Sequence, residues 1–479
     1  MPDWLPDLAL RTYSALIFCA YVVGVLCAIF ALWRSRTPQG AAAWVVALLT
    51  IPFFTVPFFL FLGRNKFYGY VKSRRHLDAE AQRELDEVRK IQEAVVAPEP
   101  GFEALHRIAG LTKQPGYTDG NSLRLLIDGE ETFAAIFEAI ENAKHSVLFQ
   151  FYIFRDDKLG GKFAELLRKK AREGVKVYFL YDGVGTKLST AFLKKFEAAG
   201  VSYAEFRGMK RWTSRVQVNF RNHRKIVVVD GRIAFTGGFN VGDDYLGEYP
   251  HIGPWRDTHL RLEGPAALSA QLCFVKDWYW AMEALPDLDW TPRPSAKNCR
   301  ALLLATGPAD DNEPCLLAHL DLIRNAQKRV WIANPYFVPP ESLLHALELA
   351  VLRGVDVRIL VPSYTDNKWI SYASETSQER ALAAKLDLRS YQPGFLHEKV
   401  VLIDDRAVAV GSVNLDSRSF FINFEATAIA HDPELVVAVA RMLDFDFARA
   451  KKLRYEDFRA RGLLRQIRSR AVNLLSPML

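Results

Sequence analysis

A pattern of histidine, lysine, aspartate and asparagine occurs twice in this sequence of 479 residues. In each copy histidine stands two residues before lysine, aspartate five residues after it and asparagine fifteen residues after it: His223, Lys225, Asp230 and Asn240, then His397, Lys399, Asp404 and Asn414. The residues between lysine and aspartate are apolar and mostly β-branched, which is typical of a strand. Residues two apart on a strand share a face, so each copy is predicted to present an imidazole beside a fixed cation.

The segments before the two copies also resemble each other. Residues 141–149 are echoed by residues 324–332, and residues 172–180 by residues 352–360. Helical and strand patterns alternate through both stretches, which favours an α/β fold with helices flanking each sheet. The repeat is too long for a solenoid. The sequence therefore predicts two duplicated halves that pack together and bring both sets of side chains to one site, suited to an anionic phosphodiester.

Two apolar runs open the chain. Residues 12–33 carry no charge and are long enough to cross a bilayer as a helix. Residues 41–63 form a second run, rich in Phe and interrupted by Pro52 and Pro57. We predict a membrane hairpin of two transmembrane helices, in preference to a cleaved signal peptide or buried helices of a soluble core.

Positive charges near these runs predict the orientation of the hairpin. Arg34 and Arg36 lie in the short link, whereas more cations follow the second run, namely Arg64, Lys66, Lys72, Arg74 and Arg75. The positive-inside rule then places the large C-terminal part in the cytoplasm.

The net charge of +7 predicts an anionic partner, for which nucleic acid and anionic lipid both have the right sign. The five cysteines show neither metal-ligand spacing nor an even count for a disulfide framework. Near the C-terminus, residues 449–470 hold nine cations and two acids interleaved with apolar residues. Such a basic amphipathic segment is typical of a surface that lies on anionic lipid, although a helix that packs its apolar stripe on the core has a similar pattern.

The repeated pattern resembles the paired signatures of the phospholipase D superfamily. Together with the two apolar runs, four flanking segments narrow this resemblance to the bacterial cardiolipin synthases: residues 221–225, 237–245, 255–259 and 475–479. The resemblance implies two phospholipase D-like α/β/α sandwich halves that share one active site, with no cofactor and no metal ion. His259 and His251 flank Trp255 and Asp257, but their spacing matches no common metal site.

The resemblance also implies a role for each repeated residue. Lys225 and Lys399 would supply fixed charge, and the two asparagines, Asn240 and Asn414, would donate to phosphate oxygens. One imidazole would attack phosphorus and the other would protonate the leaving oxygen; we take His223 as the nucleophile, although the two sets are nearly equivalent.

Asp230 and Asp404 are counted with the catalytic residues on the strength of the resemblance. Their side chains could orient a ring N–H or hold a backbone turn, and the sequence leaves both roles open. Arg418 and Glu425 are weaker candidates, for which a structural salt bridge is an equal alternative. The segment from Trp255 to Asp257 is expected on a strand beside the site.

The implied reaction transfers a phosphatidyl group between two phosphatidylglycerol molecules, giving cardiolipin and glycerol. Phosphatidylethanolamine is an open alternative as the partner lipid. A phospholipase D-type hydrolase or nuclease would use the same residues, and a membrane scaffold on an inactive fold is a further rival. The two apolar runs argue against nucleic acid as a partner. The expected location is the bacterial inner membrane, spanned more than once.

The predicted organisation has six parts. They are a membrane hairpin (1–75), a connecting helix and linker (76–115), the first half (116–285), a linker (286–298), the second half (299–447) and the basic C-terminal segment (448–479).

Overall fold

The computed structural model describes residues 4–63, 67, 69–71, 99–206, 219–247, 253–365 and 367–476. The chain divides into two compact units, one of residues 1–70 with 209–220 and one of residues 71–208 with 221–479. Most of the predicted connecting helix, the cations that follow the second apolar run, His251 and the last three residues lie outside the described residues.

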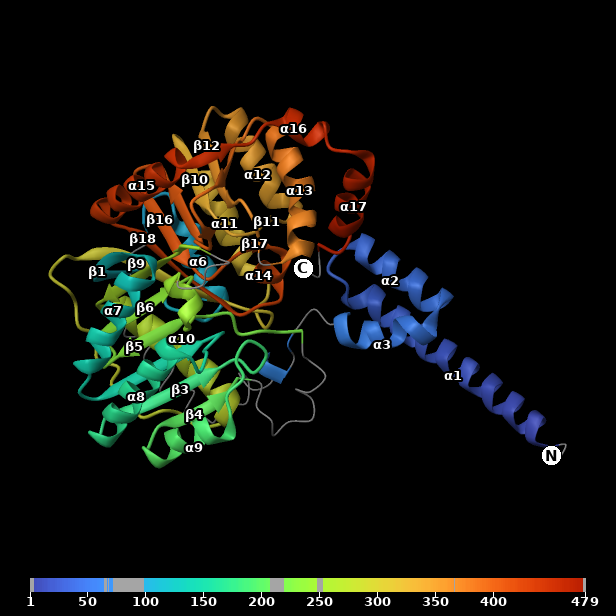
Figure 1. Ribbon diagram of the computed structural model, residues 1–479, viewed down its shortest axis with the longest axis horizontal. Coiled ribbons are helices and arrows are strands. Elements are labelled where there is room, and N and C mark those ends of the chain that lie inside the picture. Colours follow the sequence, from blue (N-terminus) through green and yellow to red (C-terminus); the bar gives the residue numbers. More distant parts are fainter. Residues whose placement is uncertain are drawn as a thin grey trace. The chain divides into compact units, whose positions relative to one another are not determined.

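Among its described residues, the first unit has one helix long enough to span a bilayer. Helix α1 (Trp4–Arg34) includes the apolar stretch Thr12–Arg34, with a mean hydropathy of 2.7 (Figure 1). It packs closely on α2, because a Cβ on Gly24 would lie 2.6 Å from the carbonyl oxygen of Leu48. The predicted first transmembrane helix therefore matches a helix of suitable length and composition.

The second apolar run forms two short helices instead of one long one. They are α2 (Pro38–Thr50) and α3 (Pro52–Leu62). Proline has no N–H and favours the first turn of a helix, so Pro52 ends α2 at Ile51 and starts α3. With 13 and 11 residues, each helix is shorter than the roughly 20 residues that cross a bilayer. The second spanning segment of the predicted hairpin therefore stays a prediction.

The second unit is built on one sheet of 15 strands. The strands of its first half are β1 (Thr118–Ile127), β2 (Ser146–Phe151), β3 (Lys176–Tyr181), β4 (Ser202–Glu205), β5 (Ile226–Val229), β6 (Ile233–Gly237) and β8 (Thr258–Glu263). Those of its second half are β9 (Cys299–Thr306), β10 (Arg329–Ala333), β12 (Asp356–Pro362), β13 (Asp387–Tyr391), β15 (Val400–Ile403), β16 (Ala407–Gly411), β18 (Glu425–His431) and β19 (Ala450–Lys452).

Strand order confirms the predicted duplication. The first half runs β1-β8-β6-β5-β2-β3-β4 and the second runs β9-β18-β16-β15-β10-β12-β13, with β19 added at the edge. Each strand of one half therefore has a counterpart in the other, and the halves join where β1 pairs antiparallel with β9. Strands β5 and β15, which lie between the lysine and the aspartate of the two patterns, occupy equivalent positions in their halves.

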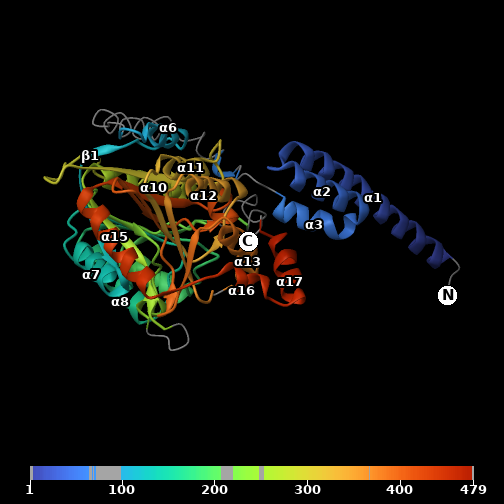
Figure 2. The same cartoon turned by 90° about the horizontal axis from the view of Figure 1, so that it is seen from above.

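Helices cover both faces of the sheet, as Figure 2 shows, with α10, α11 and α12 on one side and α7, α8 and α15 on the other. In the first half they are α7 (Asp128–Glu141), α8 (Lys158–Arg172), α9 (Thr190–Ala198), η2 (Asp243–Leu246) and α10 (Pro265–Met282). Helix α6 (Glu103–Leu111) comes before this half and packs into the core of the second half. In the second half they are α11 (Pro314–Asn325), α12 (Glu341–Leu352), α13 (Lys368–Ala383), α14 (Ser417–Phe421), α15 (Pro433–Ala448), α16 (Tyr455–Arg459) and α17 (Leu463–Asn473).

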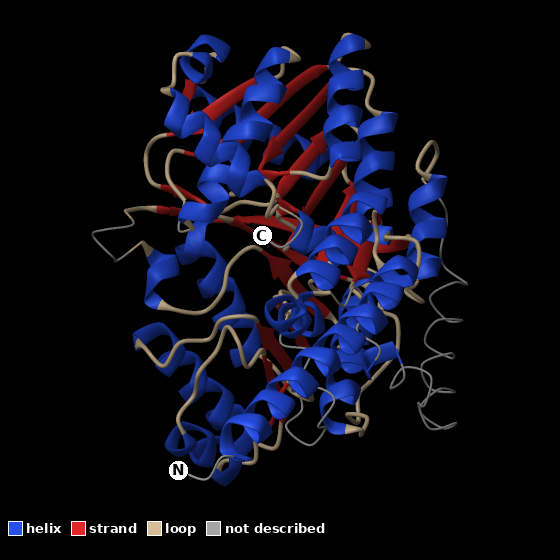
Figure 3. Ribbon diagram, turned by 90° about the vertical axis from the view of Figure 1, so that its right-hand side faces the viewer, coloured by secondary structure: helices blue, strands red, loops and turns tan. Residues whose placement is uncertain are grey.

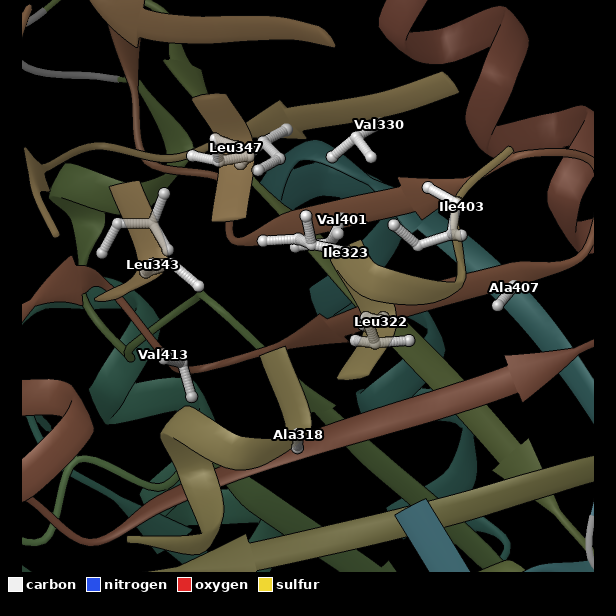
Figure 4. Close-up of a cluster of buried hydrophobic side chains, with 14 of the residues drawn as sticks. Ala318, Leu322, Ile323, Val330, Leu343, Leu347, Val401, Ile403, Ala407 and Val413 are labelled. Atoms are coloured by element: carbon white, nitrogen blue, oxygen red, sulfur yellow. The ribbon is translucent and has the colours of Figure 1, made fainter. Parts of the chain in front are cut away.

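Each half has its own hydrophobic core between the sheet and its helices. In the second half, Val401 and Ile403 of β15 lie in one cluster with Leu322 and Ile323 of α11 (Figure 4). All four residues of β5 and of β15 are buried, which explains their uninterrupted apolar sequence. These two buried strands fix the position of the histidine and lysine that precede each of them. Figure 3 shows the sheet with helices on its faces.

Candidate active site

Both repeated patterns begin where the backbone of one half is hydrogen-bonded to the backbone of the other. Before β5, the backbone N–H of His223 donates to the carbonyl oxygen of Phe424 at 2.9 Å. Before β15, the N–H of His397 donates to the carbonyl oxygen of Arg256 at 2.7 Å, next to the pairing of β14 (Phe395–Leu396) with β7 (Trp255–Arg256). Each histidine is therefore fixed by backbone from the opposite half.

A carboxylate from the opposite half orients the ring of His223. Its Nδ1 lies 3.0 Å from Oε2 of Glu425 and 3.1 Å from the carbonyl oxygen of Ser412. Since both partners are acceptors, Nδ1 carries the proton and Nε2 keeps its lone pair. Burial lowers the pKa of His223 to about 4, and this value includes the opposing attraction of Glu425 and the repulsion by Lys225 and Lys399. Lys399 belongs to the second pattern, so its charge acts on the histidine of the first.

The ring of His397 is held in the same crossed manner. Its Nδ1 lies 2.6 Å from Oδ2 of Asp257, and its ring lies 5.1 Å from the ring of Trp255 between centroids. Burial raises the pKa of Asp257 to about 6, against the opposing charges of Lys399 and Lys225. The close approach of this carboxylate requires glycine at position 238, where a Cβ would lie 2.0 Å from Asp257 Oδ1.

The two lysines are buried beside their histidines. Lys225 Nζ donates to the carbonyl oxygen of His223 at 2.6 Å, and Lys399 Nζ donates to that of His397. Their exposed fractions are 0% and 4%. Burial lowers the pKa of Lys225 to about 7, because a buried ammonium group lacks the hydration it has in water. An anionic phosphate would restore the lost stabilisation of these charges.

The asparagines lie beyond β6 and β16. The backbone N–H of Ile153 donates to Oδ1 of Asn240 at 3.1 Å, and Nδ2 of Asn240 donates to the hydroxyl of Tyr245 at 3.2 Å. Asn414 is also buried, and its Oδ1 has no hydrogen-bond partner among the described residues. Their role as phosphate donors stays a prediction.

Asp230 and Asp404 lie at the far ends of β5 and β15. Each lies five positions after its lysine, a span of about 16 Å along extended chain. The carboxylate of Asp230 accepts from the backbone N–H groups of residues 144–146 at 2.7–2.9 Å, and that of Asp404 accepts from those of residues 327–329. Both have a left-handed backbone. Of the two roles left open, these hydrogen bonds are those of a turn-holding residue.

The sequence matches a known protein family in both halves. A family model described as "Cardiolipin synthase, PLD-like domain" matches residues 136–248 and 319–446. The chain is 45% identical over 475 residues to cardiolipin synthase A of Pseudomonas entomophila, covering 98% of both chains. The chain belongs to the cardiolipin synthase family. The resemblance inferred from the repeated pattern is thereby confirmed.

Other relatives agree with this family membership. Cardiolipin synthase A of Pseudomonas aeruginosa strain LESB58 is 43% identical over 474 residues, with 98% of this chain and 96% of that protein covered. The crystal structure of a phosphatidylserine synthase from Haemophilus influenzae aligns with a TM-score of 0.58 over 74% of this chain and 95% of that one, at 16% identity. That similarity shows a shared fold, and the matching family model describes this fold as PLD-like.

Local sequence reasoning did not assign Asp257 and Glu425 as the partners of the two histidines. Each lies in the half opposite its histidine, 140 and 202 residues away along the chain. A signal was present, because Asp257 comes just before β8 and Glu425 begins the equivalent strand β18. Aligning the two halves on their strands would have revealed this pair of acids.

Two guanidinium groups act on Tyr152, whose ring is a neighbour of His223. Arg221 Nη1 donates to the hydroxyl of Tyr152 at 3.3 Å, and the ring of Tyr152 lies 5.2 Å from that of His223. Burial lowers the pKa of Arg418, and the charge of Arg221 lowers it further. Two mutually repelling cations at this place suit an anionic ligand.

The residue between histidine and lysine joins the two halves in both copies. Arg224 Nη1 donates to Asp277 of α10 at 2.7 Å, and its other nitrogens donate to the carbonyl oxygens of Glu425 and Thr306. At the equivalent place, Glu398 lies 3.1 Å from Arg256. These buried ion pairs hold the histidines in register.

We expect Asp277→Ala to lower the free energy of unfolding by about 3–5 kcal/mol, because it leaves the buried Arg224 without its carboxylate. Urea unfolding of the detergent-solubilised protein measures the change. The matched control is Asp287→Ala, which removes an exposed partner of Lys176 and should cost less than about 1 kcal/mol. Equal losses in the two variants would contradict the structural role of the buried pair.

Proposed function

We propose that this chain transfers the phosphatidyl group of one phosphatidylglycerol molecule to another, releasing glycerol and forming cardiolipin. One observation carries the proposal: two imidazoles from duplicated halves are each oriented through Nδ1 by a carboxylate of the other half, and each lies beside a buried lysine. Family membership supplies the lipid substrate class.

In the first step, Nε2 of His223 attacks phosphorus, a nitrogen–phosphorus bond forms and the bond from phosphorus to the glycerol oxygen breaks. His397 gives its proton to that oxygen. A nucleophile must be unprotonated, and a pKa of about 4 keeps His223 neutral near pH 7. Lys225 and Lys399 offset the charge that builds on the phosphate oxygens.

In the second step, His397 takes the proton from the acceptor hydroxyl, whose oxygen attacks phosphorus and releases His223. Asp257 holds the ring of His397 through both transfers. Atoms and charges balance without a further reactant, so the proposed reaction uses no cofactor and no metal ion.

Membrane attachment is part of the proposal. Helix α1 has the length and hydropathy of a spanning helix, and lipid substrates rather than nucleic acid suit such a chain. We infer a location in the bacterial inner membrane, with α2 and α3 completing the membrane part and the catalytic unit on the cytoplasmic side.

Product analysis tests the function. The purified full chain, incubated with phosphatidylglycerol, should give cardiolipin and glycerol in equal amounts. Phosphatidic acid as the main product would identify a hydrolase, and no turnover would favour a scaffold; either result would overturn the proposal. Adding phosphatidylethanolamine shows which lipid serves as the phosphatidyl donor, because transfer from that lipid releases ethanolamine instead of glycerol.

A further inference from the structure

Helix α17 turns its apolar residues outward. Leu463, Leu464, Ile467 and Leu474 are 71%, 85%, 54% and 81% exposed. A surface helix of a soluble protein normally buries its apolar stripe and exposes its charges. Of the two sequence-based alternatives, a helix that packs its apolar stripe on the core does not describe this arrangement, because the stripe is exposed.

The inward side of α17 is polar. Glu375 on α13 is buried and accepts hydrogen bonds from Arg465 at 2.6 Å and from the hydroxyl of Ser469; Arg461 lies 3.1 Å away. These contacts lower the pKa of Glu375, outweighing the effect of burial. Val472 adds a small apolar contact to the same side. Helix α17 lies beside α13 (Figures 1 and 2). The buried carboxylate of Glu375 holds its polar side, and the apolar residues stay exposed.

The exposed stripe has a definite shape. At about 100° per residue, Leu464, Ile467, Ala471 and Leu474 fall with the neighbouring leucines in an arc of about 120°. Arg468 and Arg470 lie at the two margins of this arc. Such an arrangement is that of a helix lying in the plane of a membrane, where flanking cations meet the headgroups and the stripe meets the acyl chains.

The surrounding charge is positive. Residues 454–470 contain six arginines and two acids, and two glutamates of α13, Glu375 and Glu379, face α17. Six cations less four acids leave a net charge of +2. Anionic lipid headgroups complement this charge.

The stripe lies at the edge of the sheet where the site is. Parallel strands β10 and β12 end at this edge, and Ala333 at the end of β10 pairs with Val400, next to Lys399. Helix α13 begins just after β12, and its Ile370 and Ala373 contact Val472 of α17. A surface that covers α17 therefore lies on the side from which a lipid headgroup would reach the histidines.

We propose that α17 is an in-plane membrane anchor, with the Leu464–Leu474 stripe inserted among the lipids of an anionic bilayer. This contact orients the catalytic unit with its site toward the lipid surface. The occupant is the bilayer itself; a second copy of the chain is the alternative that the experiment separates.

A fluorophore at position 464 tests the proposal. The full chain carries Leu464→Cys in a background of Cys19→Ser and Cys299→Ser, is labelled with an environment-sensitive dye and is placed in nanodiscs containing phosphatidylglycerol. Leu352→Cys is the matched control, because Leu352 is 83% exposed and ends α12 at the opposite edge of the sheet. Both labelled proteins must first form the same products from phosphatidylglycerol as the unmodified chain does. This control separates the present test from the test of the proposed function.

Lipids with a quencher near the headgroup should reduce the emission at position 464 at least about threefold more than at position 352. Weaker quenching in phosphatidylcholine nanodiscs would support the role of charge, and equal quenching there would contradict it. Equal access of aqueous iodide to both positions would overturn the anchor. So would disulfide or bismaleimide crosslinking of two Leu464→Cys chains through position 464 together with shielding from lipid quenchers, because a second copy would then cover the stripe.

Discussion

Replacing His223 with alanine should lower cardiolipin formation by about 10⁴-fold or more, because the reaction loses the atom that bonds to phosphorus. His397→Ala should give a loss of similar size, and the double variant should lose little more. Residues that act as one unit give non-additive losses. Product formation from phosphatidylglycerol, followed by mass spectrometry, measures all three. His345→Ala is the control, because this histidine lies on α12, away from the repeated patterns.

A substrate with a better leaving group separates the two roles. A phosphatidyl ester of p-nitrophenol releases its phenolate without needing a proton, so His397→Ala should still form the phosphohistidine while His223→Ala should not. An adduct in His223→Ala and none in His397→Ala would make His397 the nucleophile. An adduct in both variants would refute a single nucleophilic histidine.

The sequence predicts the duplicated fold because the information is local and occurs twice. Echoing segments, apolar strands and matched spacing are each readable over about ten residues, and the strand order of the two halves agrees with them. The placement of His223 and Lys225 at the start of a strand could also be predicted, because the apolar residues that follow them form the fully buried strand β5.

What sequence reasoning could not provide depends on contacts between the halves. The carboxylate partners, Asp257 and Glu425, meet their histidines only after the two halves pack together. Asp230 belongs to the same local pattern as His223, yet the length of β5 carries it to the opposite end of the strand. Spacing predicts which residues recur, whereas strand length and packing decide which of them meet.

The same limit applies at both ends of the chain. Pro52 divides an apolar run whose total length favoured one spanning helix. In α17, an apolar stripe and a basic stripe were both readable, but the side that faces inward depends on the buried Glu375 of a distant helix. Amphipathic pattern predicts the helix, and only the tertiary partner decides its rotation.

The second large effect should come from the two carboxylates. Asp257→Asn and Glu425→Gln should each lower turnover by roughly 10²- to 10³-fold, since a neutral amide keeps the shape of the side chain but does not stabilise a protonated imidazole. Each side chain contacts a histidine rather than the lipid, so both act as positioning residues. The initial rate of cardiolipin formation between pH 5 and pH 9 is the measurement.

The pH profile distinguishes positioning from a general structural role. The pKa of Asp257 is raised to about 6, so the wild-type rate should fall as the pH drops through 6 and Asp257 becomes protonated. In Asp257→Asn this group no longer titrates, and that acid limb should be lost from the profile. An unchanged acid limb would show that another group controls it.

Stability should change in opposite directions in the two variants. A carboxyl with a raised pKa contributes stability at low pH that is lost as the pH rises through the raised value, so Asp257→Asn should melt at a higher temperature than the wild type at pH 8. Burial alone would raise the pKa of Glu425, but His223 and Lys225 bring it below its usual value. Its charge therefore stabilises the fold above the unfolded-state pKa, and Glu425→Gln should melt at a lower temperature at pH 8. If both variants melted at a lower temperature, the loss of turnover in Asp257→Asn would be explained by a damaged fold. If Asp257→Asn were more stable but slower, the role of Asp257 would be to position His397 rather than to stabilise the fold.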